Sequence, residues 1–179
     1  MKEILDQCGR IDALINNAGV VSHKPFMKTP RDELRGTIET NLIAQMEISW
    51  EVLPHFLDRN CGTIVNVISS AGKFGFPNMA AYCASKHGLL GFTKALATEM
   101  RGTNVKIIGV CPARVDTEMH RQSYPEVYRS WLRHTILTPE NVARRIVDVV
   151  INIGTRNGQI VDIDPWHTNM FHKMHGRFQ

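Results

Sequence analysis

The sequence predicts a doubly wound α/β fold, in which one parallel sheet is covered by helices on both faces. Two observations predict it. Four short runs rich in Ile and Val have the character of buried parallel strands, and stretches long enough for whole helices separate them. Because a helix that returns the chain to the start of the next strand produces a parallel pair, we expect about four parallel strands in a single domain over residues 1–179.

The expected strands are short and apolar, as is typical of strands that helices cover on both sides. They span Ile11–Asn16, Gly62–Ile68, Asn104–Cys111 and Gln159–Ile163. Before the first of them, Met1–Leu5 has the pattern of the end of a helix.

Three longer helices are expected between these strands. The first spans about Pro30–Leu57, where apolar residues recur at helical spacing, and the second spans about Met79–Met100. The third covers about Glu140–Ile153, with Thr138 as its N-cap and Pro139 in its first turn.

Composition and charge exclude several classes of protein. The net charge of +4 comes from 21 basic and 17 acidic residues that are scattered, so the sequence shows no nucleic-acid-binding surface. Every apolar run is far shorter than the roughly 20 residues that cross a bilayer, which predicts no membrane span. The N-terminus lacks a signal-like apolar core, and the four cysteines are far apart without C-x-x-C spacing, so we expect a cytoplasmic protein.

A candidate proton-transfer pair follows the second expected strand. Tyr82 and Lys86 are four residues apart on one expected helix face, and a cation near a phenol favours its ionised form. The pair alone is a weak signal, because Tyr and Lys at this spacing occur by chance in many helices. Ser69 strengthens it, since a hydroxyl at the end of that strand could hydrogen-bond a substrate carbonyl that the tyrosine protonates.

Five motifs, in order and spacing, resemble those of the short-chain dehydrogenase/reductase family, and the resemblance covers nearly the whole chain. They are Asn16-Asn17-Ala18-Gly19, Asn41 within Thr40-Asn41-Leu42, the segment Gly62–Ser70, Tyr82-x-x-x-Lys86, and Pro112–Thr117. The resemblance implies the second half of a Rossmann-type domain. It also implies reversible hydride transfer between NAD or NADP and a small-molecule carbonyl/alcohol pair.

The resemblance implies roles for four residues of the catalytic centre. Tyr82 would be the general acid/base, and Ser69 would orient the carbonyl or hydroxyl of the substrate. Lys86 would lower the pKa of Tyr82 and hold the nicotinamide ribose, and Asn41 would position a water in a proton relay. Ser70 is a rival for the serine role; Ser69 is preferred because it precedes Tyr82 by 13 residues, as the family's serine usually does.

Further residues would contact the cofactor by the same resemblance, beside Tyr82 and Lys86. On the adenosine side these are Asn17, Ala18 and Gly19, and on the nicotinamide side they are Pro112, Val115 and Thr117. The family usually has Pro-Gly where this sequence has Pro112-Ala113, which is harmless if the φ of Ala113 is negative and costly if it must be positive.

The family's Gly-rich phosphate loop has no counterpart here, because Gly9 is the only glycine before the first expected strand. Without that loop the cofactor would lose the donors that hold its phosphates, and Ile11–Asn16 would become an edge strand with an uncovered apolar face. Three interpretations therefore stay open: part of a longer oxidoreductase, a non-catalytic interaction or regulatory module, or a short enzyme that binds cofactor weakly. A homo-oligomer formed through the first two long helices is implied by the family.

Two other segments carry weaker signals. Between Thr117 and Pro139 lies an apolar stripe at helical spacing (Tyr124, Val127, Tyr128, Trp131 and Leu132). The resemblance implies that this segment is a substrate-covering lid, and an ordinary surface helix packed on the core is the alternative. The C-terminal His167, His172 and His175 lack a completing carboxylate or Cys, so we interpret them as part of a solvated or partner-facing tail.

Overall fold

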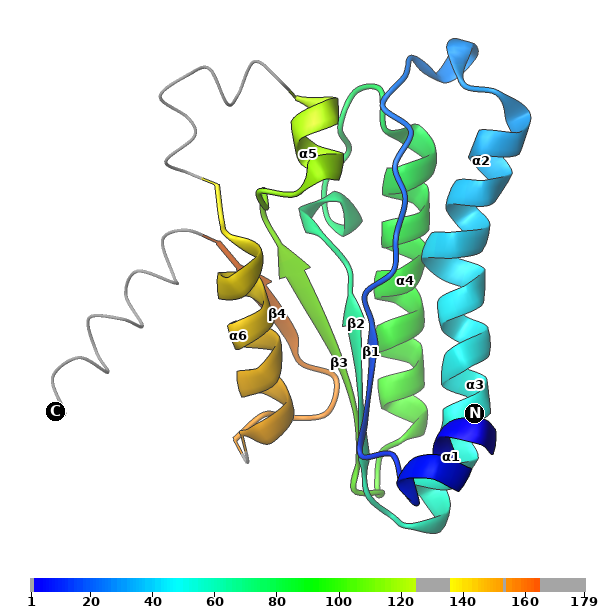
Figure 1. The fold of residues 1–179 in the computed structure, drawn as a ribbon, viewed down its shortest axis with the longest axis vertical. Coiled ribbons are helices and arrows are strands. Elements are labelled where there is room, and N and C mark those ends of the chain that lie inside the picture. Colours follow the sequence, from blue (N-terminus) through cyan, green and yellow to red (C-terminus); the bar gives the residue numbers. More distant parts are fainter. Residues whose placement is uncertain (1, 125–135, 153, 165–179) are drawn as a thin grey trace, which may run out of the picture.

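The computed structural model describes residues 2–124, 136–152 and 154–164. Its strands form one parallel sheet in the order β1-β2-β3-β4 (Figure 1). They are β1 (Ala13–Asn16), β2 (Gly62–Val67), β3 (Val105–Pro112) and β4 (Ile160–Ile163). Each strand lies beside the one that precedes it in the chain, and the predicted sheet of about four parallel strands is confirmed.

Helices connect the strands, as the sequence predicts. They are α1 (Lys2–Cys8), α2 (Arg31–Ile38), α3 (Ala44–Asp58), α4 (Ala80–Glu99), α5 (Glu118–Ser123) and α6 (Pro139–Ile151), with the shorter turns η1 (Phe26–Lys28), η2 (Glu39–Ile43) and η3 (Ser70–Gly72). At the start of α6, the Thr138 side chain accepts a hydrogen bond from the Asn141 amide, and Pro139 occupies the first turn. The predicted cap of this helix is confirmed.

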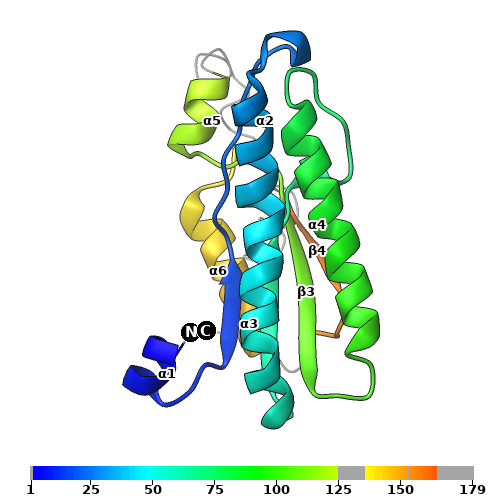
Figure 2. The same cartoon turned by 90° about the vertical axis from the view of Figure 1, so that its right-hand side faces the viewer.

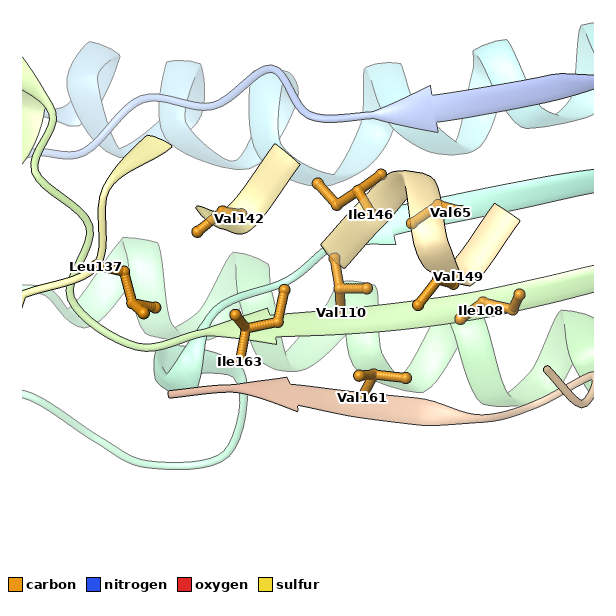
Figure 3. Packing of buried hydrophobic residues seen from close by; sticks show 9 residues of the cluster. All are labelled: Val65, Ile108, Val110, Leu137, Val142, Ile146, Val149, Val161 and Ile163. Atoms are coloured by element: carbon orange, nitrogen blue, oxygen red, sulfur yellow. The ribbon is translucent and has the colours of Figure 1, made fainter. Parts of the chain in front are cut away.

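The core consists of two layers, because successive side chains of a strand point to opposite faces of the sheet. In β2, Ile64 packs with residues of α3 and α4, whereas the next residue, Val65, packs with residues of α6. Figures 1 and 2 show α3 and α4 on one face and α6 on the other. Figure 3 shows the α6 layer, in which Val142, Ile146 and Val149 lie over the apolar side chains of β2, β3 and β4.

The first strand begins two residues later than predicted. At Ile11 the backbone amide and carbonyl bond to side chains of α3 and the residue after it, and not to a neighbouring strand. The amide of Ile11 donates to Nε2 of His55 at 3.3 Å, and its carbonyl accepts from Nη1 of Arg59 at 2.6 Å. The ladder with β2 starts at Ala13, which pairs with Thr63.

The predicted helix over Pro30–Leu57 is interrupted by a π turn, η2, which separates α2 from α3. A π turn accommodates one extra residue and rotates the faces of the helix after it. Asn41 lies inside this turn, and its side chain bonds to the backbone of the segment that follows β1. Helical spacing of apolar residues does not reveal such an insertion, so the sequence predicted one continuous helix.

Among the strands that the structure describes, β1 lies at the end of the sheet and pairs only with β2. Ile15, on this strand, is 44% exposed, and the core cluster that contains α6 includes no residue of β1. The predicted open edge, with an uncovered apolar face, is therefore confirmed for the described residues.

Candidate active site

The candidate site lies at the carboxyl ends of the strands, at the top of the view in Figure 1. Ser69 follows β2 and precedes η3, and Tyr82 lies in the first turn of α4. Contacts between η3 and α4 bring these two segments together. The fold thus joins the strand-end serine and the helix tyrosine that are 13 positions apart in the sequence.

Ser69 has a backbone conformation that side-chain-bearing residues rarely adopt, with φ of 139° and ψ of 161°. This region is almost restricted to glycine, and a residue held there costs about 1–3 kcal/mol. Two contacts maintain it: the Ser69 hydroxyl accepts a hydrogen bond from the Ala71 amide at 3.1 Å, and the next residue back, Ile68, bonds to Val110 of β3. Such strain is concentrated at functional sites, where it fixes the direction of a side chain.

The ammonium group of Lys86 is buried near the ring of Tyr82. Only 3% of the residue is exposed, and its Nζ donates to the Val67 carbonyl at 2.8 Å. The same Nζ lies 5.8 Å from the centre of the Tyr82 ring. Burial disfavours the charged form and lowers the pKa of Lys86 from 10.5 to about 8.

Burial of Tyr82 dominates the pKa of its phenol. Burial raises the pKa of the phenol above its ordinary value of 10, and the hydrogen bond from Ser69 lowers it only in part. Lys86 is not among the groups that shift it. Desolvation of the phenolate is therefore the largest influence on the pKa of Tyr82, and the expected role of Lys86 in lowering that pKa stays a prediction.

Asn41 is fully buried and its amide is largely occupied by protein groups. Its Oδ1 accepts from the Val20 amide at 2.8 Å, and its Nδ2 donates to the Val20 carbonyl at 2.9 Å and to the Ser85 hydroxyl at 3.1 Å. The Ser85 hydroxyl in turn donates to the Tyr82 carbonyl at 2.7 Å. Asn41 thus connects the turn after β1 to the helix of the Tyr82 and Lys86 pair, and its part in a water relay stays a prediction.

Gly19 leaves room beside these groups that a side chain would fill. A Cβ at this position would lie 3.3 Å from Oδ1 of Asn41 and 3.8 Å from Nζ of Lys86. The preceding Asn17 and Ala18 are exposed. The turn after β1 therefore presents accessible backbone next to the buried ammonium group.

The sequence pattern did not predict a network of hydrogen bonds between buried polar side chains of β1, β2, α3 and α4. Asn16 donates to Asn66 at 2.8 Å and to Ser49 at 3.0 Å, and Asn66 donates to Thr93 at 2.9 Å. Asn66 interrupts an otherwise apolar strand, and this interruption is the signal that could have indicated the network.

The segment after β3 begins with Pro112, the last residue of that strand. Ala113 does not have a positive φ, and its amide donates to Ile163 at 2.8 Å, so the replacement of the usual glycine introduces no strain. Val115 forms a bridge with Leu137, and the Thr117 side chain caps α5 by accepting from the His120 amide at 3.3 Å.

Only the start of the predicted lid belongs to the described residues. The Tyr124 ring lies 4.6 Å from the His23 ring, and its hydroxyl contacts the Met79 sulfur at 3.0 Å. The segment after α5 therefore contacts both the loop after β1 and the start of α4. Val127, Tyr128, Trp131 and Leu132 lie outside the described residues, as do His167, His172 and His175.

A family model described as short chain dehydrogenase matches residues 1–127. The chain belongs to the short chain dehydrogenase family. The motif resemblance seen in the sequence is therefore confirmed.

Curated relatives in this family include reductases of ketoacyl groups. The ketoacyl reductase HetN of Nostoc sp. (strain PCC 7120) is 37% identical over 156 residues, which cover 85% of this chain and 52% of HetN. The 3-oxoacyl-(acyl-carrier-protein) reductase FabG of Chlamydia pneumoniae is 32% identical over 148 residues, which cover 80% of this chain and 60% of FabG. The chain thus spans between about half and two thirds of the length of these short chain dehydrogenases.

Solved structures of similar proteins contain dinucleotides. 4-Hydroxyisoleucine dehydrogenase complexed with NADH and succinate is 29% identical, with a TM-score of 0.79 over 92% of this chain and 71% of that chain. ElxO with NADP bound is 27% identical, with a TM-score of 0.82 over 94% of this chain and 71% of that chain. The fold is the Rossmann-type doubly wound α/β fold of these proteins.

Other kinds of site find no support in the described part of the chain. No group of three or more His, Cys, Asp or Glu side chains there could hold a metal ion, and no helix there is long and apolar enough to cross a membrane. All four cysteines are free: Cys8 and Cys61 are exposed, and Cys83 and Cys111 are buried.

Proposed function

We propose that this chain carries the catalytic centre of an oxidoreductase that uses NAD or NADP to interconvert a carbonyl and an alcohol. The observation that carries the proposal is the arrangement of Ser69, Tyr82 and Lys86: a hydroxyl on a strained backbone, a phenol whose pKa that hydroxyl lowers, and a buried ammonium group 5.8 Å from the phenol ring. The names of the relatives, which are reductases and dehydrogenases, support the same reaction class.

The proton chemistry follows from the state of Tyr82. Because burial keeps its pKa above 10, the phenol is neutral at physiological pH and can donate its proton to a carbonyl oxygen that gains negative charge. Ser69 would hold that oxygen within reach by hydrogen bonding. The Lys86 ammonium would stabilise the phenolate that remains after transfer.

The dinucleotide supplies or accepts the hydride when it is bound. The Gly19 backbone lies next to Lys86, and a cofactor bound against this turn would receive hydrogen bonds from the Lys86 Nζ at its ribose hydroxyls. Asn17 and Ala18 would line the adenosine side, and the segment from Pro112 through Val115 to Thr117 would contact the carboxamide. Solved relatives with NADH and with NADP support either dinucleotide.

A homo-oligomer is the proposed assembly. On α3, Met46, Trp50 and Leu57 are 37%, 74% and 40% exposed, and exposed apolar side chains that gather on one helix face are typical of a protein interface. The second copy would cover these side chains.

The test is a fluorescence titration of this chain with NADH and with NADPH, followed by an assay of dinucleotide-dependent reduction of a 3-oxoacyl ester, since two relatives are reductases of ketoacyl groups. We expect binding of one dinucleotide and turnover that Tyr82→Phe lowers by about 10²–10⁴-fold with the fold intact. The same assays on a version extended upstream, if the gene encodes one, measure the contribution of preceding residues. Wild-type turnover in Tyr82→Phe would refute the mechanism.

A non-catalytic interaction module is the second candidate, and the open edge of β1 favours it, because an unpaired strand edge can bind another chain. It predicts that neither form of the chain binds a dinucleotide, while the purified chain is a stable oligomer by analytical ultracentrifugation.

A further inference from the structure

Gln45 is a buried side chain outside the predicted catalytic centre that contacts the turn after β1. It lies on α3, is 2% exposed, and its Nε2 donates to the Ala18 carbonyl at 2.7 Å. Asn41, one helical turn earlier, bonds to both the amide and the carbonyl of Val20. Two amide side chains, one in the π turn η2 and one in the first turn of α3, therefore hold the backbone on either side of Gly19.

The other end of the Gln45 amide is unsatisfied. Its Oε1 is enclosed and accepts no hydrogen bond from the described residues. Reversing the amide would not help, because Oε1 would then face the Ala18 carbonyl, another acceptor. A buried acceptor without a partner destabilises the folded chain, whereas an apolar side chain of similar length would avoid that loss.

The Ala18–Val20 turn lies against two buried polar groups of the candidate site. Gly19 faces Oδ1 of Asn41 and Nζ of Lys86, where even a methyl group would be in tight contact. A shift of the turn of a few tenths of an ångström would therefore change the space beside the ammonium group.

We propose that Gln45 is a positioning residue that acts with Asn41 to hold the Ala18–Val20 turn against Lys86, and that it thereby sets the affinity of the site for a dinucleotide. The second part rests on the proposed function. The unsatisfied Oε1 lowers the stability of the folded chain. The hydrogen bond from Nε2 to the Ala18 carbonyl explains why a glutamine nevertheless occupies this position.

The test compares Gln45→Met with Ser49→Ala in the full chain. Methionine keeps the length of the side chain but removes both the bond to Ala18 and the enclosed oxygen. Ser49 lies one turn further along α3 and bonds to Asn16 instead of the turn, so it is the matched control. In Gln45→Met we expect faster hydrogen exchange at the Val20 amide, measured relative to Ile64 in the core, with urea stability retained.

In the same variant the dissociation constant for the preferred dinucleotide should rise about tenfold, as expected when a small displacement misplaces a binding group. Ser49→Ala should lower the urea stability and leave both the Val20 exchange and the dissociation constant unchanged. Unchanged Val20 exchange in Gln45→Met, or equal effects of the two variants, would overturn the inference. Failure of both this chain and a version extended upstream to bind either dinucleotide would refute the proposed function, while the exchange at Val20 would still decide whether Gln45 holds the turn.

Discussion

Lys86 combines a charged group with near-complete burial, and this makes its protonation part of the stability of the fold. Below about pH 8 the side chain is protonated in both the folded and the unfolded chain, and its buried charge disfavours folding. Between about pH 8 and 10.5 the folded chain has released this proton while the unfolded chain retains it. The free energy of unfolding should therefore rise with pH through this window.

Comparison with Lys86→Met isolates this contribution. Relative to the variant, the wild type should gain on the order of 3 kcal/mol of unfolding free energy between pH 8 and 10.5, because each pH unit between the two pKa values is worth about 1.4 kcal/mol. Urea denaturation at a series of pH values measures it. Lys94→Met, on the exposed side of the same helix, is the control and should follow the wild type. Parallel curves for wild type and Lys86→Met would contradict the prediction.

Ser69 allows the strain of the site to be separated from its chemistry. Ser69→Gly and Ser69→Ala both remove the hydroxyl, but only glycine adopts a φ of 139° without steric cost. We expect Ser69→Gly to be more stable than Ser69→Ala by about 1–3 kcal/mol in thermal or urea unfolding, with both variants inactive. Equal stability of the two would show that the backbone is relaxed at this residue.

Much of the candidate site could be predicted at the residue scale, because its chemistry depends on residue types at fixed spacing. Ser69, Tyr82, Lys86, Asn41 and Gly19 come together at one edge of the sheet, as the sequence indicated. The direction of the Tyr82 pKa could not be predicted, since it depends on how deeply the phenol is buried. Gln45 was also missed, because a single glutamine in a helix gives no spacing signal.

At the scale of elements, η3 and α4 approach each other so closely that they require a glycine. A Cβ on Gly72 would lie 2.4 Å from the Ile68 side chain and 2.8 Å from the Lys86 carbonyl, which is rigid helix backbone. This contact fixes the distance between the segment that follows Ser69 and the helix that carries Tyr82.

Gly72→Ala should therefore lower the unfolding free energy by about 1–3 kcal/mol, as overpacking does, and reduce turnover in the proposed reaction. Gly75→Ala is the control: it lies three residues further along, has open space at the Cβ position, and should change stability by less than about 0.5 kcal/mol. Circular dichroism melts of the two variants make the comparison. A Gly72→Ala chain as stable as Gly75→Ala would contradict the close approach.

The bounds of helices and strands were predicted well where the spacing of apolar residues sets them. They were predicted less well where hydrogen bonds between distant polar groups set them. The cap of α6 and the order of the strands follow from Thr138, Pro139 and the apolar runs. The π turn around Asn41 and the late start of β1 arise from contacts between residues more than twenty positions apart, at Val20 and at His55. No local pattern contains that information.

At the scale of the whole molecule, the open edge of β1 predicts self-association. Ile15 is 44% exposed next to unpaired backbone groups, a combination that promotes edge-to-edge pairing. Ile15→Lys should reduce the association measured by sedimentation velocity without a loss of stability. Val147→Lys adds the same charge on the exposed side of α6, where Val147 is 51% exposed, and should leave association as it is. Identical sedimentation of the two variants would show that the edge is not involved.

The strand order of the parallel sheet also determines how the chain must fold. The pairing of Ala13 with Thr63 and of Gly109 with Ile160 joins residues that are roughly fifty positions apart, and none of the four described strands is joined to its neighbour by a short hairpin. Each pair can form only after a long loop has closed and the intervening helix has collapsed onto the growing sheet. Refolding of this chain should accordingly be slow for its size, with β1 exposed throughout to encounters with other molecules.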